Sequence, residues 1–372
     1  MKKIKILYFQ LEPTMGGIET FLISLYNKID KHKFQLDFVS NTSNINSLPY
    51  LDKLKGANIF PIPSFKNITQ YVQDINNILN YKYDIVHFNK NSDANIIPLI
   101  LAKHNKNIGK IIVHSHNTNN STNNKLFQLL HYVNRPYVNR ISDCKIACSS
   151  EAARWLFKKD DVEIIKNGID VERYLFSEKK RNKIREEYGV PLDSIVMGFV
   201  GRFTHQKNLP LLVDIFYKYQ KLNPNSYLLL VGDGVEKKII SQKVANLGLN
   251  NKVIFTGEKM NITGFLDAMD IFVMSSFYEG LPISCVEAQA SGLNTFISST
   301  ISNEVKLLSN LKQFYISENP EKIAQLIFNT KISSGNERYL QNEIVYNQYD
   351  ISKTILSINN LYNKMIEEKN NV

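Results

Sequence analysis

Cysteine is scarce in this chain of 372 residues, and the scarcity narrows the kinds of site that it can hold. The three cysteines, Cys144, Cys148 and Cys285, lack the paired C-x2-C spacing of a zinc site. An odd number of cysteines without a disulfide framework suits a reducing compartment. We therefore expect Cys144 and Cys148 to be small core residues and the protein to be cytoplasmic.

Long apolar runs are missing as well. No stretch approaches the roughly 20 apolar residues that a membrane-spanning helix needs. The first ten residues, MKKIKILYFQ, hold only a short apolar run, which predicts a first strand and not a secretory signal.

Basic residues exceed acidic ones, 45 against 35, and the formal net charge is +10. Nucleic acid, an anionic membrane surface and phosphorylated substrates all suit a basic protein. The basic residues are scattered, and no nucleic-acid-binding motif accompanies them. We therefore favour phosphates and an anionic membrane surface as partners, and we do not expect nucleic acid.

Short apolar runs alternate with helical patterns along the chain, which is typical of parallel sheets covered by helices on both faces. A chain of this length can form two such α/β domains. We place the first domain at residues 1–170, a densely charged and solvent-facing linker at 171–193, and the second domain at 194–348. A last helical pattern covers residues 349–372.

Ligands of parallel sheets bind at the carboxyl ends of the strands. Gly16 and Gly17 stand between the first strand and a helical pattern, where the backbone can approach an anion, although an ordinary turn is an equal alternative. His87, His114 and His116 stand at the ends of two later strands, as acid–base groups, phosphate partners or plain loop residues. We do not expect metal binding, because no carboxylate or third ligand lies nearby in the sequence.

The second half opens with an apolar strand at residues 195–200, and Arg202 and Lys207 follow it. Both cations then project from the carboxyl end of a strand, where a diphosphate would bind. Arginine offers a planar fork and lysine a point charge, and both stabilise a leaving diphosphate without a metal. Two ordinary surface cations are the alternative interpretation. Gly232 follows the next strand.

Residues 275–292 read SSFYEGLPISCVEAQASG and follow a strand at 271–274. The loop presents Glu279, Gly280, Leu281 and Pro282, and Pro282 suits the first position of the helix that follows. A helix start binds phosphate, whereas Glu279 and Glu287 would repel it and suit sugar hydroxyls instead. A nucleotide-sugar pocket fits this combination, and a plain strand–loop–helix unit is the alternative.

Glu279 and Glu287 are separated by seven residues, and in this context the spacing resembles the E-x7-E signature of the retaining GT-B glycosyltransferases of family 4. Three further stretches resemble that family: the G-G-x-E loop at Gly16, Gly17 and Glu19, the G-R-(x)n-K-G motif at Arg202 and Lys207, and the V-G-x-G turn at Gly232. Asn208 replaces the usual glycine of the second motif, which can alter the loop shape but not its charge. The resemblance covers nearly the whole chain.

The resemblance implies a GT-B fold, in which two Rossmann-like domains face a deep cleft and the last helix packs back on the first domain. It implies retaining transfer of a hexose or N-acetylhexosamine from a nucleoside-diphosphate sugar, with UDP as the family-level expectation. The stretches HSHN, CSSEAARWLF and VEAQASG are most similar to the bacterial branch that builds capsular or exopolysaccharide on a lipid-diphosphate carrier. The protein would then be peripheral on the inner face of the cell membrane.

Residue roles follow from the same resemblance. Arg202 and Lys207 would carry the charge of the diphosphate, Glu287 would accept ribose hydroxyls and Glu279 would position the transferred sugar. His116 would orient the sugar or the acceptor, and His87 resembles a structural histidine. The remaining donor-binding positions would be Gly16, Gly17, Gly232, Gly280 and Leu281. The sequence contains no Asp-x-Asp motif, so we expect no divalent metal and no other cofactor.

A polar loop at residues 119–124 precedes a basic and amphipathic helical pattern at 125–140. Such a helix can lie on an anionic bilayer, and we take it as the candidate to touch a lipid-linked acceptor. It can equally pack its apolar side on the sheet, which is the interpretation that we favour from the sequence.

Three other functions stay open. A sugar-nucleotide epimerase on the same fold would need an acid–base pair near the anomeric carbon. A sucrose- or glycogen-type synthase would use a soluble acceptor. A non-catalytic donor-binding subunit would show damaged motifs, whereas Arg202, Lys207, Glu279 and Glu287 are all present.

Overall fold

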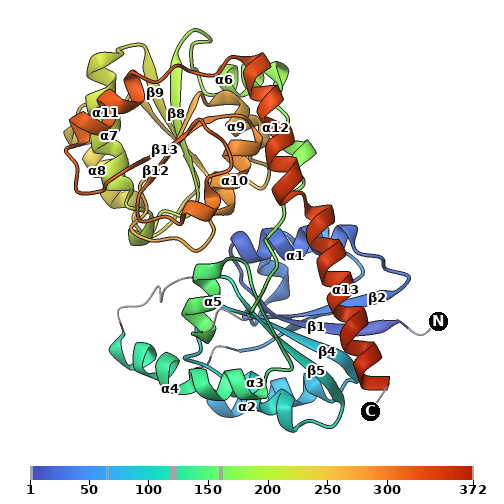
Figure 1. Cartoon of the computed structure of the whole chain (residues 1–372). Helices are drawn as coiled ribbons and strands as arrows, with labels where there is room; N and C mark the ends of the chain where they lie inside the picture. The colour runs from blue at the N-terminus through green and yellow to red at the C-terminus, as the bar shows by residue number, and fades with distance from the viewer. Residues whose placement is uncertain (1–2, 64, 66, 118–123, 159–161, 371–372) are drawn as a thin grey trace. The chain divides into compact units, whose positions relative to one another are not determined.

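The computed structural model describes residues 3–63, 65, 67–117, 124–158 and 162–370, and it divides into two compact units (Figure 1). Unit 1 comprises Met1–Gly168 and Ile351–Val372, and unit 2 comprises Ile169–Asp350. The polar loop expected at 119–124 lies, except for Asn124, outside the described residues. Among the residues that are described, no helix is both long and apolar enough to cross a membrane.

Unit 1 contains a seven-stranded parallel sheet in the order β3-β2-β1-β4-β5-β6-β7. Its strands are β1 (Ile4–Leu11), β2 (Phe34–Ser40), β3 (Ile59–Pro61), β4 (Tyr83–Lys90), β5 (Ile108–Ser115), β6 (Cys144–Ala147) and β7 (Glu163–Ile164). The middle strands are buried on both faces, which explains their continuous apolar runs.

The helices of unit 1 are α1 (Gly17–Lys28), α2 (Ile68–Leu79), α3 (Ile97–His104), α4 (Lys125–Ile141), α5 (Ser150–Phe157) and α13 (Ile351–Asn370). Between β2 and β3 the chain forms two short 3-10 turns, η1 (Ile45–Ser47) and η2 (Leu51–Leu54), and no α-helix. Pro49 explains the break, because a proline disfavours helical backbone at the residue before it. The apolar side of α4 was expected to pack on the sheet, and this prediction is wrong, because most of its large apolar side chains are exposed.

Unit 2 contains a six-stranded parallel sheet in the order β10-β9-β8-β11-β12-β13. Its strands are β8 (Ile195–Val200), β9 (Ser226–Val231), β10 (Val253–Gly257), β11 (Ile271–Met274), β12 (Asn294–Ser298) and β13 (Leu311–Phe314). Its α-helices are α6 (Glu178–Glu187), α7 (Leu209–Leu222), α8 (Lys237–Asn246), α9 (Thr263–Ala268), α10 (Ile283–Ala290), α11 (Pro320–Phe328) and α12 (Gly335–Tyr349). Its 3-10 turns are η3 (Val171–Tyr174), η4 (His205–Lys207) and η5 (Asn303–Val305).

Each sheet reverses its strand order at one point, between β1 and β4 in unit 1 and between β8 and β11 in unit 2. The loops that leave the two strands at such a point run in opposite directions and leave a crevice at the carboxyl edge. The motifs that the sequence suggested for the donor follow these strands or a strand next to them. Glu287 is the exception, because it lies inside α10, the helix that follows β11. The fold therefore gathers the motif residues of each unit at one edge of its sheet.

The segment 171–193, expected to link the domains, belongs to unit 2, where η3 contacts α12 and α6 contacts α9. The expected return of residues 349–372 to the first domain corresponds to α13, which belongs to unit 1. The hydroxyl of Tyr362 on α13 bonds to the hydroxyl of Tyr8 on β1, and His87 Nδ1 lies 2.9 Å from the same Tyr362 oxygen.

The charged helix α6 was expected to face solvent, but one of its charged side chains, Arg185, is completely buried. Its guanidinium donates to the carbonyls of Pro191, Leu192, Ser194 and Ala268 and to Asp270 Oδ2 at 2.7 Å. The same Oδ2 accepts the backbone N–H of Val196 at 2.7 Å. One buried cation thus ties α6 to the starts of β8 and β11.

Replacing Arg185 with alanine would leave Asp270 and several carbonyls buried with fewer partners. We expect Arg185→Ala to lower the free energy of unfolding of unit 2 by about 3–5 kcal/mol, the range measured for broken buried ion pairs. Lys183→Ala, on the exposed side of the same helix, is the control and should change stability by less than about 0.5 kcal/mol. Urea unfolding of the full chain measures both, and equal effects would contradict the structural role given to Arg185.

Candidate active site

Lys207 and Glu279 meet at the carboxyl ends of β8 and β11, where the strand order of unit 2 reverses. Lys207 Nζ donates to Glu279 Oε1 at 2.6 Å, and both side chains are largely buried. The sequence placed both residues at a donor site but did not pair them. The ion pair holds the lysine and the carboxylate at fixed positions at the carboxyl edge of the sheet.

Gln206, which the sequence did not single out, joins the same two loops. Its side-chain amide donates to the carbonyl of Tyr278 at 2.9 Å and to Glu279 Oε2 at 3.3 Å. The backbone carbonyl of Gln206 accepts the backbone N–H of Phe277 at 2.8 Å. Because these bonds run between neighbouring strand ends, they fix the Glu279 loop against the Lys207 loop.

Asn208 adopts the left-handed conformation, with φ 49° and ψ 44°. Glycine adopts this conformation freely, and asparagine tolerates it better than most other residues. The replacement of the usual glycine therefore preserves the backbone conformation that a glycine would supply. Ser275 Oγ donates to the Asn208 carbonyl at 2.9 Å and holds the turn against the end of β11.

Arg202 is exposed at the end of β8, and no acidic side chain among the described residues forms an ion pair with it. Gly232 follows β9 with φ 141°, and a Cβ there would collide with the carbonyl oxygen of Gly201. The close approach of these two strand ends therefore requires glycine at position 232.

Glu287 lies inside α10 and is almost completely buried, as are Gly280 and Leu281 before the helix. The sequence had suggested that Pro282 is the first residue of the helix, whereas the structure places it one residue earlier, at the N-cap position. The hydroxyl of Tyr174, in η3, donates to Glu287 Oε1 at 2.5 Å. Burial raises the pKa of Glu287 to about 7, while the hydrogen bond from Tyr174 and the charge of Arg173 lower it.

In unit 1, Gly16 and Gly17 stand at the start of α1, and Gly16 is its N-cap. Glu19 is buried and accepts the backbone N–H of Glu12 at 3.1 Å, so it braces the loop between β1 and α1. Gln10, near the end of β1, has φ 83° at a bulge in the pairing with β2. A non-glycine residue in this conformation stores strain of a kind that often accompanies functional sites.

His116, just after β5, is held between two asparagines. Asn167 donates to its Nδ1 at 3.1 Å, so the proton of the neutral ring lies on Nε2, which donates to Asn89 Oδ1 at 2.9 Å. Burial lowers the pKa of His116 to about 3, although the Asn167 bond opposes the shift. The ring is therefore neutral at pH 7.

His114 and His87 continue this cluster into the core. The ring of His114 lies 3.8 Å from that of His116, and its Nδ1 lies 3.3 Å from Nε2 of His87. Burial lowers the pKa of both inner histidines well below the ordinary value. They are completely buried and connect Tyr362 of α13 with His116.

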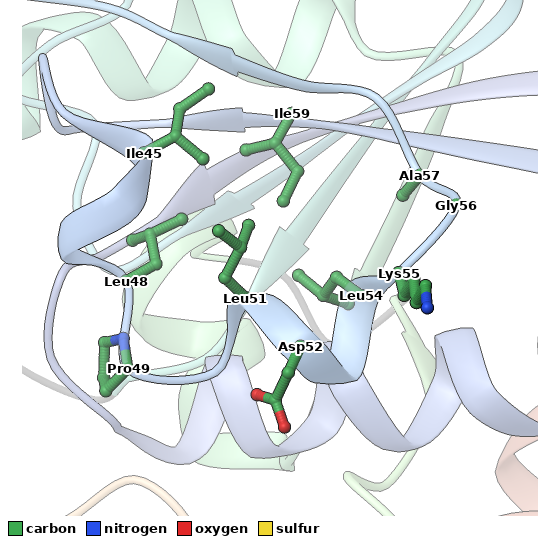
Figure 2. A pocket seen from close by; sticks show the side chains of 10 residues that line it. All are labelled: Ile45, Leu48, Pro49, Leu51, Asp52, Leu54, Lys55, Gly56, Ala57 and Ile59. Atoms are coloured by element: carbon green, nitrogen blue, oxygen red, sulfur yellow. The ribbon is translucent and has the colours of Figure 1, made fainter.

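A surface hollow of about 710 Å³ lies elsewhere in unit 1, beside η1, η2 and β3 (Figure 2). Its lining is mainly apolar, with Ile45, Leu51 and Ile59 pointing toward one another and Asp52 and Lys55 at its margin. None of the motif residues lines it, so we do not assign it to the candidate active site.

Besides Gln206, the sequence analysis missed Tyr174, Asn89 and Asn167. Asn89 lies two residues after His87, and Asn167 lies three residues before the predicted end of the first domain at 170, so both stood close to positions that the sequence had singled out. Tyr174 carried no such signal, because its partner Glu287 lies more than one hundred residues away in the sequence.

Two family models and several relatives match most of the chain. Residues 15–173 match the family model of Glycosyltransferase Family 4, and residues 180–341 match that of Glycosyl transferases group 1. The chain is 28% identical over 370 residues to the putative glycosyltransferase EpsF of Bacillus subtilis (strain 168), covering 96% of this chain and 95% of that protein. It is 25% identical over 391 residues to the UDP-Gal:alpha-D-GlcNAc-diphosphoundecaprenol alpha-1,3-galactosyltransferase of Escherichia coli, covering 99% and 98%.

Among solved structures, HepE of Anabaena in complex with UDP and glucose has a TM-score of 0.81 at 19% identity, covering 97% of this chain and 100% of that one. This likeness concerns the fold, and it confirms the α/β class predicted from the sequence. The two family models together span both parallel-sheet units. The chain therefore belongs to glycosyltransferase family 4 and has the GT-B fold.

Proposed function

We propose that the protein transfers a hexose or N-acetylhexosamine, with retention of configuration, from a UDP-sugar to a lipid-diphosphate-linked saccharide in capsular or exopolysaccharide biosynthesis. The observation that carries this proposal is the buried Lys207–Glu279 pair at the strand reversal of unit 2, with the exposed Arg202 on the same loop as Lys207. Such a site offers fixed positive charge for a leaving diphosphate together with a carboxylate for sugar hydroxyls.

The relatives support the choice of donor and acceptor. The Escherichia coli relative is named for a UDP-galactose donor and a diphosphoundecaprenol-linked acceptor. The HepE structure contains UDP and glucose. The net charge of +10 suits both a nucleotide donor and an anionic membrane carrying the acceptor, so we place the protein peripherally on the inner face of the cell membrane.

Arg202 and Lys207 stabilise the charge that develops on the diphosphate, helped by the backbone N–H groups of Gly280 and Leu281 before α10. These groups do the work that a divalent metal does in other glycosyltransferases, so the proposed transfer needs no metal. Glu287 accepts hydrogen bonds from the ribose, and Glu279 positions the sugar. The glycines at 16, 17 and 232 let the backbone approach the donor.

His116 orients the sugar or the acceptor and does not move a proton. Its ring is neutral, and both of its nitrogens have asparagine partners. The leaving phosphate is then the base available for the acceptor hydroxyl, which agrees with attack on the same face of the sugar.

A panel of nucleotide sugars, incubated with EDTA and a membrane lipid extract, tests the function through release of nucleoside diphosphate. We expect release to require one sugar and the lipid fraction and to survive EDTA. Release without lipid would instead indicate an epimerase or a soluble acceptor. Tight binding of one donor with no release would indicate a non-catalytic subunit and contradict the proposal.

Lys207→Ala should lower kcat at least about 100-fold, because a preorganised charge at the leaving group is lost. The matched control is Lys243→Ala, since Lys243 also forms a 2.6 Å ion pair, with Asp214, but between α7 and α8. The control should keep kcat within about twofold, as expected of a partly exposed pair away from the chemistry. Comparable losses in both variants would show that the effect comes from stability and not from the diphosphate.

Donor binding should depend on the ionisation of Glu287, whose pKa is about 7. The carboxylate accepts ribose hydroxyls better than the protonated acid, so affinity for UDP should fall as the pH drops below about 7. Tyr174→Phe removes a bond that lowers this pKa, and the midpoint should therefore move to higher pH. Calorimetric titration of UDP between pH 5.5 and 8.5 measures both; a flat profile in the unmodified protein would refute this role of Glu287.

Because His116 is already neutral, its removal should lower kcat without changing the shape of the pH profile. We expect His116→Ala to reduce kcat by about 10-fold or more, as for loss of a positioning group. Initial rates of His116→Ala and the unmodified protein from pH 5 to 9 decide the question. A titration near pH 6.5 that disappears in the variant would identify His116 as an acid–base group instead.

A further inference from the structure

Helix α4 has the reverse of the usual polarity of a surface helix. Its large exposed side chains are mainly apolar: Leu126, Phe127, Leu129, Tyr132, Val133 and Tyr137. Leu129 and Val133, in the middle of the helix, are 59% and 63% exposed. A surface helix normally turns such residues toward the core and its polar residues toward water.

Polar side chains of α4 face the protein instead. His131 is completely buried, stacks on Trp155 of α5 at 4.2 Å between ring centres, and accepts the backbone N–H of Asp93 at 3.0 Å. Asn134 donates to the Asp93 carbonyl at 2.8 Å, and Asn139 donates to the Phe157 carbonyl at 3.1 Å. These bonds fix which side of α4 packs inward, so the apolar side is held outward by specific contacts.

The outward side forms one continuous face, which we call the outer face of α4. It consists of Lys125, Leu126, Leu129, Tyr132, Val133, Pro136, Tyr137 and Arg140. Its members recur at intervals of three or four residues along the helix, as in 125, 129, 132, 136 and 140 or 126, 129, 133 and 137, which is the spacing that aligns side chains on one side of a helix. The apolar centre is thus bordered by a lysine at the first turn and an arginine at the last.

The charge of α4 is of one sign. The helix contains Lys125, Arg135 and Arg140, and its sequence includes no aspartate or glutamate. Arg135 lies over the ring of Tyr132 at 4.9 Å, which keeps a cation next to the outer face. An apolar stripe with a basic border, and with tyrosines whose hydroxyls tolerate water, matches the boundary between acyl chains and anionic headgroups.

We propose that the outer face of α4 is a membrane-docking surface that lies on an anionic lipid bilayer. The helix lies parallel to the bilayer, with Leu126, Leu129 and Val133 among the acyl chains and the basic ends at lipid phosphates. The proposal rests on the lipid-linked acceptor of the proposed function, whose membrane-binding element it identifies. Because α4 begins soon after His116 in the chain, docking brings the acceptor-side histidine close to the surface that carries the acceptor.

Co-sedimentation with vesicles tests the surface. We expect the unmodified protein to bind vesicles of phosphatidylcholine with about one third phosphatidylglycerol, and to bind pure phosphatidylcholine more weakly. Leu129→Glu/Val133→Glu should lower partitioning at least about tenfold, because two charges replace inserted apolar groups. Lys125→Glu/Arg140→Glu should lower binding about tenfold on the anionic vesicles only, and added salt should reproduce part of this loss.

The matched control is Leu356→Glu, since Leu356 is 62% exposed on α13, another helix of unit 1. It should bind vesicles like the unmodified protein. All variants change exposed residues, so circular dichroism and UDP binding should be unchanged, which also separates this test from the test of the transferase activity.

Vesicle binding that survives Leu129→Glu/Val133→Glu would overturn the proposal, as would no binding by the unmodified protein. In either case, UDP binding and nucleotide release would still decide the proposed function. A third outcome would also overturn it: a dimer, seen by sedimentation velocity, that dissociates in Leu129→Glu/Val133→Glu without any vesicle binding would make the outer face a contact between two copies of this chain.

Discussion

The reversal of strand order in each parallel sheet is the constraint on which the candidate site depends. In unit 2 it makes β8 and β11 neighbours although many residues separate them in the chain, and their carboxyl ends lie at the same edge. Lys207 and Glu279 can form a 2.6 Å ion pair only because of this adjacency. The same rule in unit 1 places the Gly16 loop after β1 beside β4, and β5 with His116 follows as the next strand. Loops of modest length then suffice to gather charged and polar groups, because the sheet itself supplies the rigidity.

Buried polar contacts keep these loops from collapsing onto the sheet edge. Arg185 and Asp270 anchor the opposite end of β8 and β11, where the strands begin, so the two strands cannot slide against each other without breaking charged hydrogen bonds. At the carboxyl end, Gln206 joins the two loops. Truncating one partner of such a network leaves the others buried and unsatisfied, which costs more than each bond contributes when intact. Both ends of the β8–β11 pair are therefore fixed by polar side chains, while the apolar core fills the space between them.

The sequence predicted most of the fold because the strands are short apolar runs and the motifs follow their ends. The α/β class, the strands at 195–200 and 271–274 and the candidate donor residues Arg202, Lys207, Glu279 and Glu287 were all predicted from such local patterns. What it missed depends on contacts between distant segments. The bond from Tyr174 to Glu287 and the burial of Arg185 could not be predicted from the sequence. The residues that precede and follow Tyr174 and Arg185 in the chain look like those around an exposed side chain. The predicted orientation of α4 was wrong for a related reason. A helix with one apolar and one polar side has the same periodicity whichever side packs inward. The side that packs inward is decided by the contacts of His131, Asn134 and Asn139 with residues far away in the sequence.

The two cations of the candidate site differ in how much a bound diphosphate would have to rearrange them. Lys207 is largely buried and already held at 2.6 Å from Glu279, so its charge stands in place before the donor arrives. A preorganised charge in a site with little water stabilises a developing anion without reorganisation at the moment of reaction. Arg202 is exposed and must lose side-chain freedom when it binds phosphate, at an entropic cost of the order of 1–2 kcal/mol. In the proposed function, Lys207 would thus stabilise the transition state, and Arg202 would capture the donor with its planar fork. In the proposed function, Glu279 would both orient Lys207 and offer oxygens to the sugar, so one pair of side chains would set the charge at the leaving group and the position of the transferred sugar.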